Sequence, residues 1–368
     1  MRAIDFFCGA GGLTRGLMDA GMQVVAGIDV DQRCRETYER NNTPARFYER
    51  EIRDLSLREV WKILGSRRTS DLLFAGCAPC QPFSKHRKRQ RVECEGELVL
   101  TERQVAVDST LLGGFARLVE EARPGQVLVE NVPGLTRVLG FSTYRRFLRM
   151  LRSSGYHFVD GVIDAKHYGV PQTRQRYVLI AMRGRLPSLP GRLHGPGLMP
   201  YATVHDAISH YPPIGVGQGH PRIPNHEAAA LSDLNLQRLR STPHDGGDRR
   251  AWRTELYLEC HKGDHAGHTD VYGRMAWDRP APTLTGRCNS ISNGRYAHPR
   301  QDRGISLREA ASLQTFSDTY VFFGSNNHIA RQIGNAVPVK LAELLGRHLL
   351  SLRYGDGGHL DWTRCRTS

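Results

Sequence analysis

Short apolar runs recur through the first half of the chain, and segments with helical periodicity separate them. These runs are rich in Val, Ile, Leu and Phe, which is typical of buried strands. They cover residues 3–7, 24–28, 72–75, 127–129, 158–163 and 177–182. Between them, pairs such as Leu13 and Leu17, or Phe115 and Leu118, share one helical face. Strands that alternate with helices predict an α/β fold with a doubly wound, mostly parallel sheet, in which ligands bind at the carboxyl ends of the strands.

The pattern changes after Met182. Gly and Pro become frequent, and ten of the sixteen histidines lie between His194 and His298. A second, less regular domain is therefore expected to start here. A helical pattern returns over residues 335–352, with Leu341, Leu345 and Leu349 on it, and we expect this segment to pack on the first domain.

Length and charge fit this division and suggest a partner. At ~150 residues per domain, 368 residues correspond to about two domains. A hydrophobic content of 39% excludes a disordered chain. The net charge of +14 favours a polyanionic partner, with nucleic acid first. No apolar stretch approaches the ~20 residues of a membrane span, and no secretory segment opens the chain, so a cytoplasmic protein without a membrane partner is expected, with its eight cysteines reduced.

The first candidate motif is DFFCGAGG, residues 5–12, which leaves the first strand and opens a helix. Glycines at such a turn let a ligand approach the backbone, and Asp29 at the end of the second strand can bind ribose hydroxyls. The motif suggests an adenosine cofactor. Its spacing is not GxGxxG, and no Lys-Ser/Thr follows, which weighs against a dinucleotide or a triphosphate. The alternative is a tight strand-to-helix turn that binds nothing.

Two further motifs follow later strands. In FAGCAPCQPFS, Cys80 lies past the third predicted strand, where a thiolate can attack a bound substrate. The rival interpretation is a zinc or redox pair of Cys77 and Cys80, although no second CxxC completes a four-ligand site. Glu130 directly follows the strand 127–129, where desolvation favours a protonated acid. Taken alone, Glu130 fits a capping or ion-paired residue better than an acid.

Together with QTRQR at 172–176 and QIGNAVPV at 332–339, these motifs resemble those of the cytosine-C5 DNA methyltransferases of bacterial restriction-modification systems. The PCQ, ENV, QxRxR and GNAVP motifs occur in the family's order, and the resemblance covers nearly the whole chain. It implies a fold typical of S-adenosylmethionine-dependent methyltransferases. It divides the chain into a discontinuous catalytic domain, residues 1–183 and 326–368, and a smaller inserted target-recognition domain, residues 184–325.

The resemblance also implies a mechanism. Cys80 adds to C6 of a cytosine flipped out of the duplex, which makes C5 nucleophilic toward the methyl group of S-adenosylmethionine. Glu130 contacts N3 and the exocyclic amine and acts as the acid, while Arg176 contacts O2 with Arg174 in support. Nucleophile, acid and cation surround a ring that must briefly hold extra electron density.

The same resemblance assigns a cofactor site. Phe7 packs on the adenine, and Asp29 binds the ribose hydroxyls. The acid near the adenine amine is Glu51, a departure from the family's usual Asp, and Asp54 competes for that position. The complete expected set is Asp5, Phe7, Gly9, Gly11, Gly12, Asp29, Glu51, Pro79 and Asn335.

Double-stranded DNA is the implied partner. The basic run KHRKRQR follows Cys80, in the loop that closes over DNA in the family, although such a run can be only a solvated loop. Expected DNA contacts are Gln81, Ser84, Lys85, Arg87, Lys88 and Arg89. A cognate restriction endonuclease is a candidate partner in the cell, and catalysis by a monomer is expected.

Three alternatives remain at this point. A tRNA cytosine methyltransferase of the same fold is the nearest, although the Cys-Phe-Thr tripeptide usual in that group is absent from the recognition region. An inactive DNA-binding relative is the second. The third concerns a metal: the family requires none, yet a structural zinc site is conceivable in the cluster Cys260, His261, His265 and His268.

Overall fold

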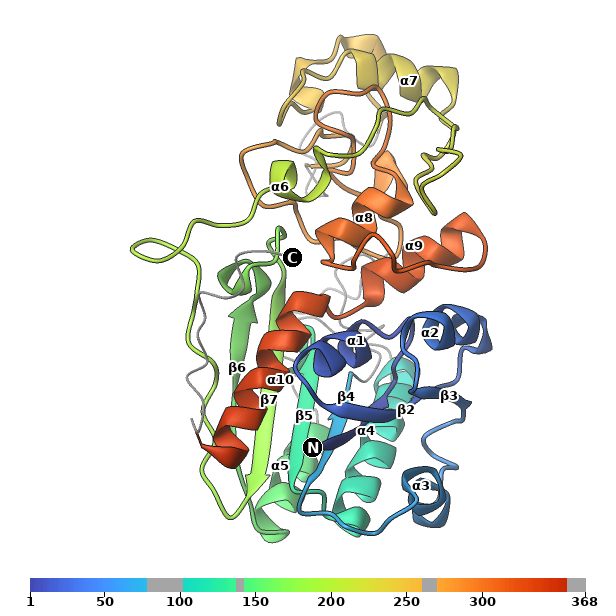
Figure 1. The fold of residues 1–368 in the computed structure, drawn as a ribbon. Helices are drawn as coiled ribbons and strands as arrows, with labels where there is room; N and C mark the ends of the chain where they lie inside the picture. Colours follow the sequence, from blue (N-terminus) through green and yellow to red (C-terminus); the bar gives the residue numbers. More distant parts are fainter. Residues whose placement is uncertain (78–101, 137–141, 260–269, 356–368) are drawn as a thin grey trace.

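The computed structural model of the chain describes residues 1–77, 102–136, 142–259 and 270–355, and it has two lobes (Figure 1). A seven-stranded sheet of order β3-β2-β1-β4-β5-β7-β6 forms the larger lobe. Its strands are β1 Arg2–Phe6, β2 Gln23–Asp29, β3 Arg46–Glu49, β4 Leu72–Gly76, β5 Gln126–Asn131, β6 Tyr156–Asp164 and β7 Gln175–Arg183. All pairs from β3 to β5 are parallel, whereas β7 runs antiparallel to β5 and β6. The predicted doubly wound, mostly parallel sheet is confirmed.

One strand was not predicted. The sequence of β3 is RFYE, and it pairs with β2 alone at the edge of the sheet. An edge strand buries less of its surface than a central one, so it needs no continuous apolar run. The four residues therefore carry too little hydrophobic signal to be recognised.

Helices cover both faces of the sheet, and the alternation of side chains along the strands supplies both cores. In β1, Ile4 and Phe6 face one apolar cluster while Ala3 faces the other. The first cluster is closed by α3 Leu57–Leu64, α4 Glu102–Ala122 and α5 Ser142–Ser153. The second is closed by α1 Gly12–Asp19, α2 Arg35–Asn41 and α10 Val339–Tyr354.

The C-terminal helix α10 lies along α1 on the face of the sheet, as Figure 1 shows. A Cβ on Gly16 of α1 would collide with Ala342 and with the carbonyl oxygen of Val339. Leu341, Leu345 and Leu349 complete the cluster from α10. The prediction that this segment packs on the first domain is confirmed, but its start was wrong. Asn335 ends α9, and the next helix starts only after Pro338.

The smaller lobe is built from short helices and loops. Its helices are α6 Val204–Ile208, α7 Asp233–Arg240, α8 Leu307–Leu313 and α9 Asn326–Asn335. Single turns of 3-10 helix occur in both lobes: Gln32–Cys34, Pro133–Thr136, Ala165–Tyr168, Arg249–Ala251, Thr254–Leu256 and Ile291–Asn293. Within the described part of residues 184–355, pairing is confined to isolated bridges and forms no strand.

The interior of this lobe contains paired charges as well as apolar side chains. The guanidinium of Arg303 binds both carboxylate oxygens of Glu309, each at 2.7 Å, and both side chains are 1% exposed. A further apolar cluster joins Ile329 and Ile333 of α9 to Val204 and Leu307. Among the helices described, none combines the length and the apolar character needed to cross a membrane.

Candidate active site

The carboxyl ends of β4 and β5 bring a thiol and a carboxylate together. Gly76 is the register partner of Val129, so the following residues, Cys77 and Glu130, lie side by side. The Cys77 thiol donates a hydrogen bond to Glu130 Oε2 at 2.6 Å. Glu130 is 2% exposed, so its carboxylate depends on protein partners rather than on water.

Arg176 provides the second partner of this carboxylate. Because β7 is antiparallel to β5, its amino end reaches the same edge of the sheet. Arg176 Nε lies 2.9 Å from Glu130 Oε1, and the side chains are 11% and 3% exposed. An acid and a cation thus adjoin at a largely dry edge, where they can bind neighbouring donors and acceptors of one planar polar ligand.

Arg174 has a different environment from Arg176. It is 1% exposed, and its guanidinium donates to the carbonyl oxygens of Leu284, Gly334 and Ala336 at 2.9, 2.9 and 3.0 Å. Burial, with the charge of Arg176 second, lowers its pKa to about 9. Through these hydrogen bonds, Arg174 fixes the start of β7 and the segments around it. Its support of Arg176 in catalysis stays a prediction.

The turn after β1 is held by Asp29. Phe7 and Gly9 have φ values of 64° and 49°, and the Phe7 N–H donates to the Ile28 carbonyl oxygen at 2.7 Å. Asp29 Oδ2 accepts from the Gly9 N–H at 2.8 Å, and Oδ1 accepts from the Asp31 N–H at 2.9 Å. Asp29 is half-buried, so it anchors the turn and keeps access to solvent.

The three predicted glycines of this turn differ in their surroundings. A Cβ on Gly11 would collide with Asn42, and one on Gly12 would lie 2.5 Å from the Val337 carbonyl oxygen. Beside Gly9, no described atom lies within 4 Å of such a Cβ. Gly11 and Gly12 thus permit close packing, while Gly9 leaves the turn open on one side. Asn335 is exposed, two residues before the Val337 that covers Gly12.

The structure places Glu51 and Asp54 in different environments. Glu51 is half-buried, and its Oε1 is a buried atom with no partner among the described residues, whereas Oε2 accepts from Arg53 at 3.2 Å. Asp54 is exposed. A buried acceptor without a partner is a costly feature that a bound donor removes, so Glu51 is the better candidate for contact with an amine.

Asp5 lies beneath the turn, with 0% exposure. Its Oδ2 accepts from Thr14 Oγ1 at 2.7 Å, and Oδ1 has no partner among the described residues. Burial raises the pKa of this carboxyl to about 7.

Other predicted site residues lie outside the described residues. They are Pro79, Cys80, Gln81, Ser84, Lys85, Arg87, Lys88 and Arg89, together with the metal candidates Cys260, His261, His265 and His268. Cys77, three positions before Cys80, is the last described residue of that motif.

A family model for C-5 cytosine-specific DNA methylases matches residues 1–351. The chain belongs to this family. Among its relatives, the type II methylase M.HgiDII of Herpetosiphon aurantiacus is 39% identical over 97% of this chain and 96% of its own. The type II methyltransferase M1.HphI of Haemophilus parahaemolyticus is 29% identical over 96% of this chain and 87% of its own.

Solved structures share the methylase fold. A DNA modification methyltransferase structure from an Escherichia coli prophage superposes with a TM-score of 0.72 at 22% identity, covering 96% of this chain and 99% of that one. Dnmt2 of Spodoptera frugiperda gives a TM-score of 0.59 at 15% identity over 96% and 99%. The sheet and its helices are thus arranged as in these methyltransferase structures.

One member of this methylase site was not predicted. Cys77 was considered only as a partner of Cys80, yet its thiol binds Glu130. Part of the signal was present in the sequence, because Cys77 and Glu130 lie within two residues of the ends of two predicted strands, 72–75 and 127–129. Only the register, which the sequence does not specify, aligns them.

The buried carboxyl of Asp5 predicts a pH effect on stability. Its folded pKa of about 7 lies above the ordinary value of 3.8, so this group's contribution is most favourable below 3.8 and becomes less so as pH rises to 7. Asp5→Asn cannot ionise. As the pH rises from 4 to 7, the free energy of unfolding of the wild type should therefore fall relative to that of Asp5→Asn, by up to about a few kcal/mol. The melting temperature of the wild type should fall with it. If the melting temperatures of the two proteins changed with pH by the same amount, the raised pKa of Asp5 would be contradicted.

Proposed function

We propose that this methylase transfers a methyl group from S-adenosylmethionine to C5 of a cytosine in a specific short sequence of duplex DNA. The observation that carries the proposal is the Glu130–Arg176 pair at the sheet edge, adjoined by Cys77 three residues before Cys80. The family match over residues 1–351 and the type II methylase relative support the same reaction.

Cys80 acts as the nucleophile. Its thiolate forms a bond to C6 of the cytosine, and the electron pair of the C5–C6 double bond moves into the ring toward N3. Once Arg176 has turned from Glu130 to the cytosine, Glu130 takes up a proton from solvent and passes it to N3. When bound, S-adenosylmethionine supplies an activated methyl group on its sulfonium. After C5 gains the methyl group, loss of the C5 proton to a base, return of the N3 proton to Glu130 and cleavage of the sulfur–C6 bond release Cys80 as the thiolate and restore the aromatic ring.

Glu130 and Arg176 recognise the ring. In the structure without substrate, they neutralise each other at 2.9 Å. A cytosine that enters between them offers O2 to the guanidinium and N3 with the exocyclic amine to the carboxyl group. These atoms adjoin on one edge of the pyrimidine, as the two protein groups adjoin on one edge of the sheet. Cys77 holds Oε2 meanwhile, so the carboxyl group keeps its orientation when Arg176 turns to the substrate.

The turn after β1 fits the adenosine part of the cofactor. Phe7 packs on the adenine, Asp29 binds the ribose hydroxyls, and the unpartnered Glu51 Oε1 accepts from the adenine amine. Pro79 and Asn335 line the same pocket, and Gly9 leaves room for the ligand. Asp5, Gly11 and Gly12 contribute from beneath, by shaping the turn.

Duplex DNA is the substrate we propose. The residues Gln81, Ser84, Lys85, Arg87, Lys88 and Arg89 contact it beside Cys80, and the net charge of +14 favours the encounter. These contacts offset the few kcal/mol needed to remove the base from the stack. Residues 184–325 form the target-recognition domain, inserted between catalytic parts 1–183 and 326–368. The type II relatives suggest a restriction-modification setting with a cognate endonuclease.

Transfer of labelled methyl from S-adenosylmethionine to unmethylated duplex DNA, with tRNA in parallel, tests this function. We expect label on DNA, at one recurring cytosine context in conversion sequencing. In the same assay, Cys80→Ser should bind DNA and transfer no methyl. Cys77→Ser is the matched control: its hydroxyl can donate the same hydrogen bond to Glu130, so transfer should persist within about tenfold of the wild type.

Three outcomes would overturn parts of this proposal. Label on tRNA alone would assign the protein to tRNA modification. Label on neither substrate, with cofactor binding intact, would indicate an inactive relative. Undiminished transfer by Cys80→Ser would remove Cys80 from the mechanism.

The role of Glu51 predicts a difference between two neighbouring acids. Glu51→Ala should weaken S-adenosylmethionine binding by about tenfold or more, because a hydrogen bond to a charged acceptor is worth ~1.5–3 kcal/mol. Asp54→Ala, an exposed acid three residues away, should bind as the wild type does. Isothermal titration calorimetry of the three proteins measures this. Equal affinities for Glu51→Ala and Asp54→Ala would exclude Glu51 from the adenine contact.

A further inference from the structure

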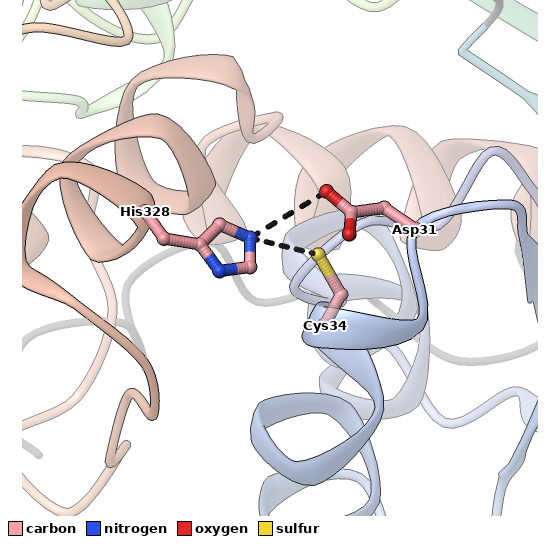
Figure 2. A group of neighbouring side chains, drawn as sticks. All are labelled: Asp31, Cys34 and His328. Carbon is pink, nitrogen blue, oxygen red and sulfur yellow. Dashed lines mark hydrogen bonds and ion pairs between the residues drawn. The ribbon is translucent and has the colours of Figure 1, made fainter.

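Three side chains with metal-binding chemistry meet outside the proposed catalytic site. Asp31 and Cys34 belong to the segment after β2, and His328 comes from α9 (Figure 2). His328 Nε2 lies 3.5 Å from Asp31 Oδ2 and 3.9 Å from Cys34 Sγ, and the three atoms all lie within 4.8 Å of one another. Cys34 and His328 are 5% and 7% exposed.

Both contacts of His328 use the same nitrogen. In a nucleophilic triad, the carboxylate and the nucleophile bind opposite nitrogens of the imidazole, so this arrangement is no triad. Instead, three donor atoms face a common point (Figure 2). In a tetrahedral zinc site with bonds of about 2.0–2.3 Å, neighbouring ligand atoms stand about 3.3–3.8 Å apart. The observed separations approach this range.

We propose that Asp31, Cys34 and His328 bind one zinc ion, with water as the fourth ligand. Thiolate sulfur, imidazole nitrogen and carboxylate oxygen are the donors that zinc takes in proteins. The Asp31 side chain is 27% exposed, which leaves that side of the site open to solvent for the water. This site is separate from the methyl-transfer residues, so the inference goes beyond the proposed function.

Ionisation of the two buried ligands affects zinc binding in opposite directions. Burial lowers the pKa of His328, which favours the neutral imidazole that zinc binds. Burial, followed by the charges of Asp29 and Asp31, raises the pKa of the Cys34 thiol to about 12. Zinc supplies the positive charge that a buried thiolate needs, so binding should release a proton.

Two positively charged side chains near the proposed site, Arg33 and Arg331, disfavour the binding of a metal cation. Arg33 binds Asp31 through Nε to Oδ1 at 2.6 Å and Nη2 to Oδ2 at 2.7 Å. Arg331, on α9 with His328, also lowers the pKa of that imidazole. The metal must therefore share Asp31 with Arg33, and removal of the Arg33 charge should tighten binding.

Bound zinc would connect the cofactor turn to the smaller lobe. The Asp31 N–H donates to Asp29 Oδ1, and Asp29 in turn anchors Gly9. On the other side, α9 carries Ile329 and Ile333 into the apolar cluster of the smaller lobe. Zinc should thus stabilise the junction of the two lobes and raise the melting temperature.

The test uses the full-length protein, stripped with a chelator and then titrated with Co²⁺ and with Zn²⁺. We expect one cobalt ion per chain at this site with a thiolate charge-transfer absorption band, which zinc displaces, and a higher melting temperature with zinc. Cys34→Ser should lose the band, and His328→Gln should lose tight binding. Arg33→Gln should bind more tightly than the wild type.

Two control variants separate this site from others. Cys288→Ser replaces another buried cysteine and should keep the band. A Cys260→Ser/His261→Ala double variant should also keep it, which excludes the other Cys-His cluster. Absence of a band in the wild type, or its retention in both Cys34→Ser and His328→Gln, would overturn the proposal and leave a cluster of three side chains that binds no metal. Because His328→Gln and Arg33→Gln do not alter the buried thiol, the test stands even if Cys34→Ser does not fold.

Discussion

The buried guanidinium of Arg174 is the constraint on which the site depends. It joins the start of β7 to Leu284 and to the carbonyl oxygens of Gly334 and Ala336, segments that lie 110 to 162 positions away in the chain. A charge in such a place is tolerated only with several hydrogen bonds. Gln172 extends the junction, since its Oε1 accepts from the Leu284 N–H at 2.9 Å and its Nε2 donates to Gln314 Oε1 at 3.0 Å.

This junction determines where Arg176 lies. The chain enters β7 at Gln175, directly after Arg174, and runs antiparallel to β5. One residue further on, the Arg176 side chain contacts Glu130. The two arginines of QTRQR thus have different roles: Arg174 fixes the backbone, and Arg176 presents its charge at the sheet edge. The same junction brings the 335–338 segment onto Gly12, so the proposed cofactor turn and the proposed cytosine site share one framework.

Most of the sheet was predicted from the sequence, because strands with continuous apolar runs are recognisable there. The carboxyl ends of parallel strands in such a fold lie at one edge of the sheet, which is where ligands were expected. That Glu130 and Arg176 lie at one site was implied by the family resemblance in ENV and QTRQR, not by the strand pattern. The edge strand β3 was missed because RFYE has no apolar run. The contact of Cys77 with Glu130 was missed because it depends on the register between β4 and β5. The group formed by Cys34 and His328 joins residues 294 positions apart, and no local pattern indicates such a contact.

The central claim, that Cys80 attacks a cytosine held by Glu130 and Arg176, is tested most directly by trapping the attack. Duplex DNA in which cytosine is replaced by 5-fluorocytosine leaves no proton at C5 to remove after methyl transfer, so the sulfur–C6 bond persists. The account predicts a covalent protein–DNA adduct that forms only with S-adenosylmethionine, and mass spectrometry should locate it on the peptide at Cys80. An adduct on Cys77, or none from protein that methylates ordinary DNA, would contradict it.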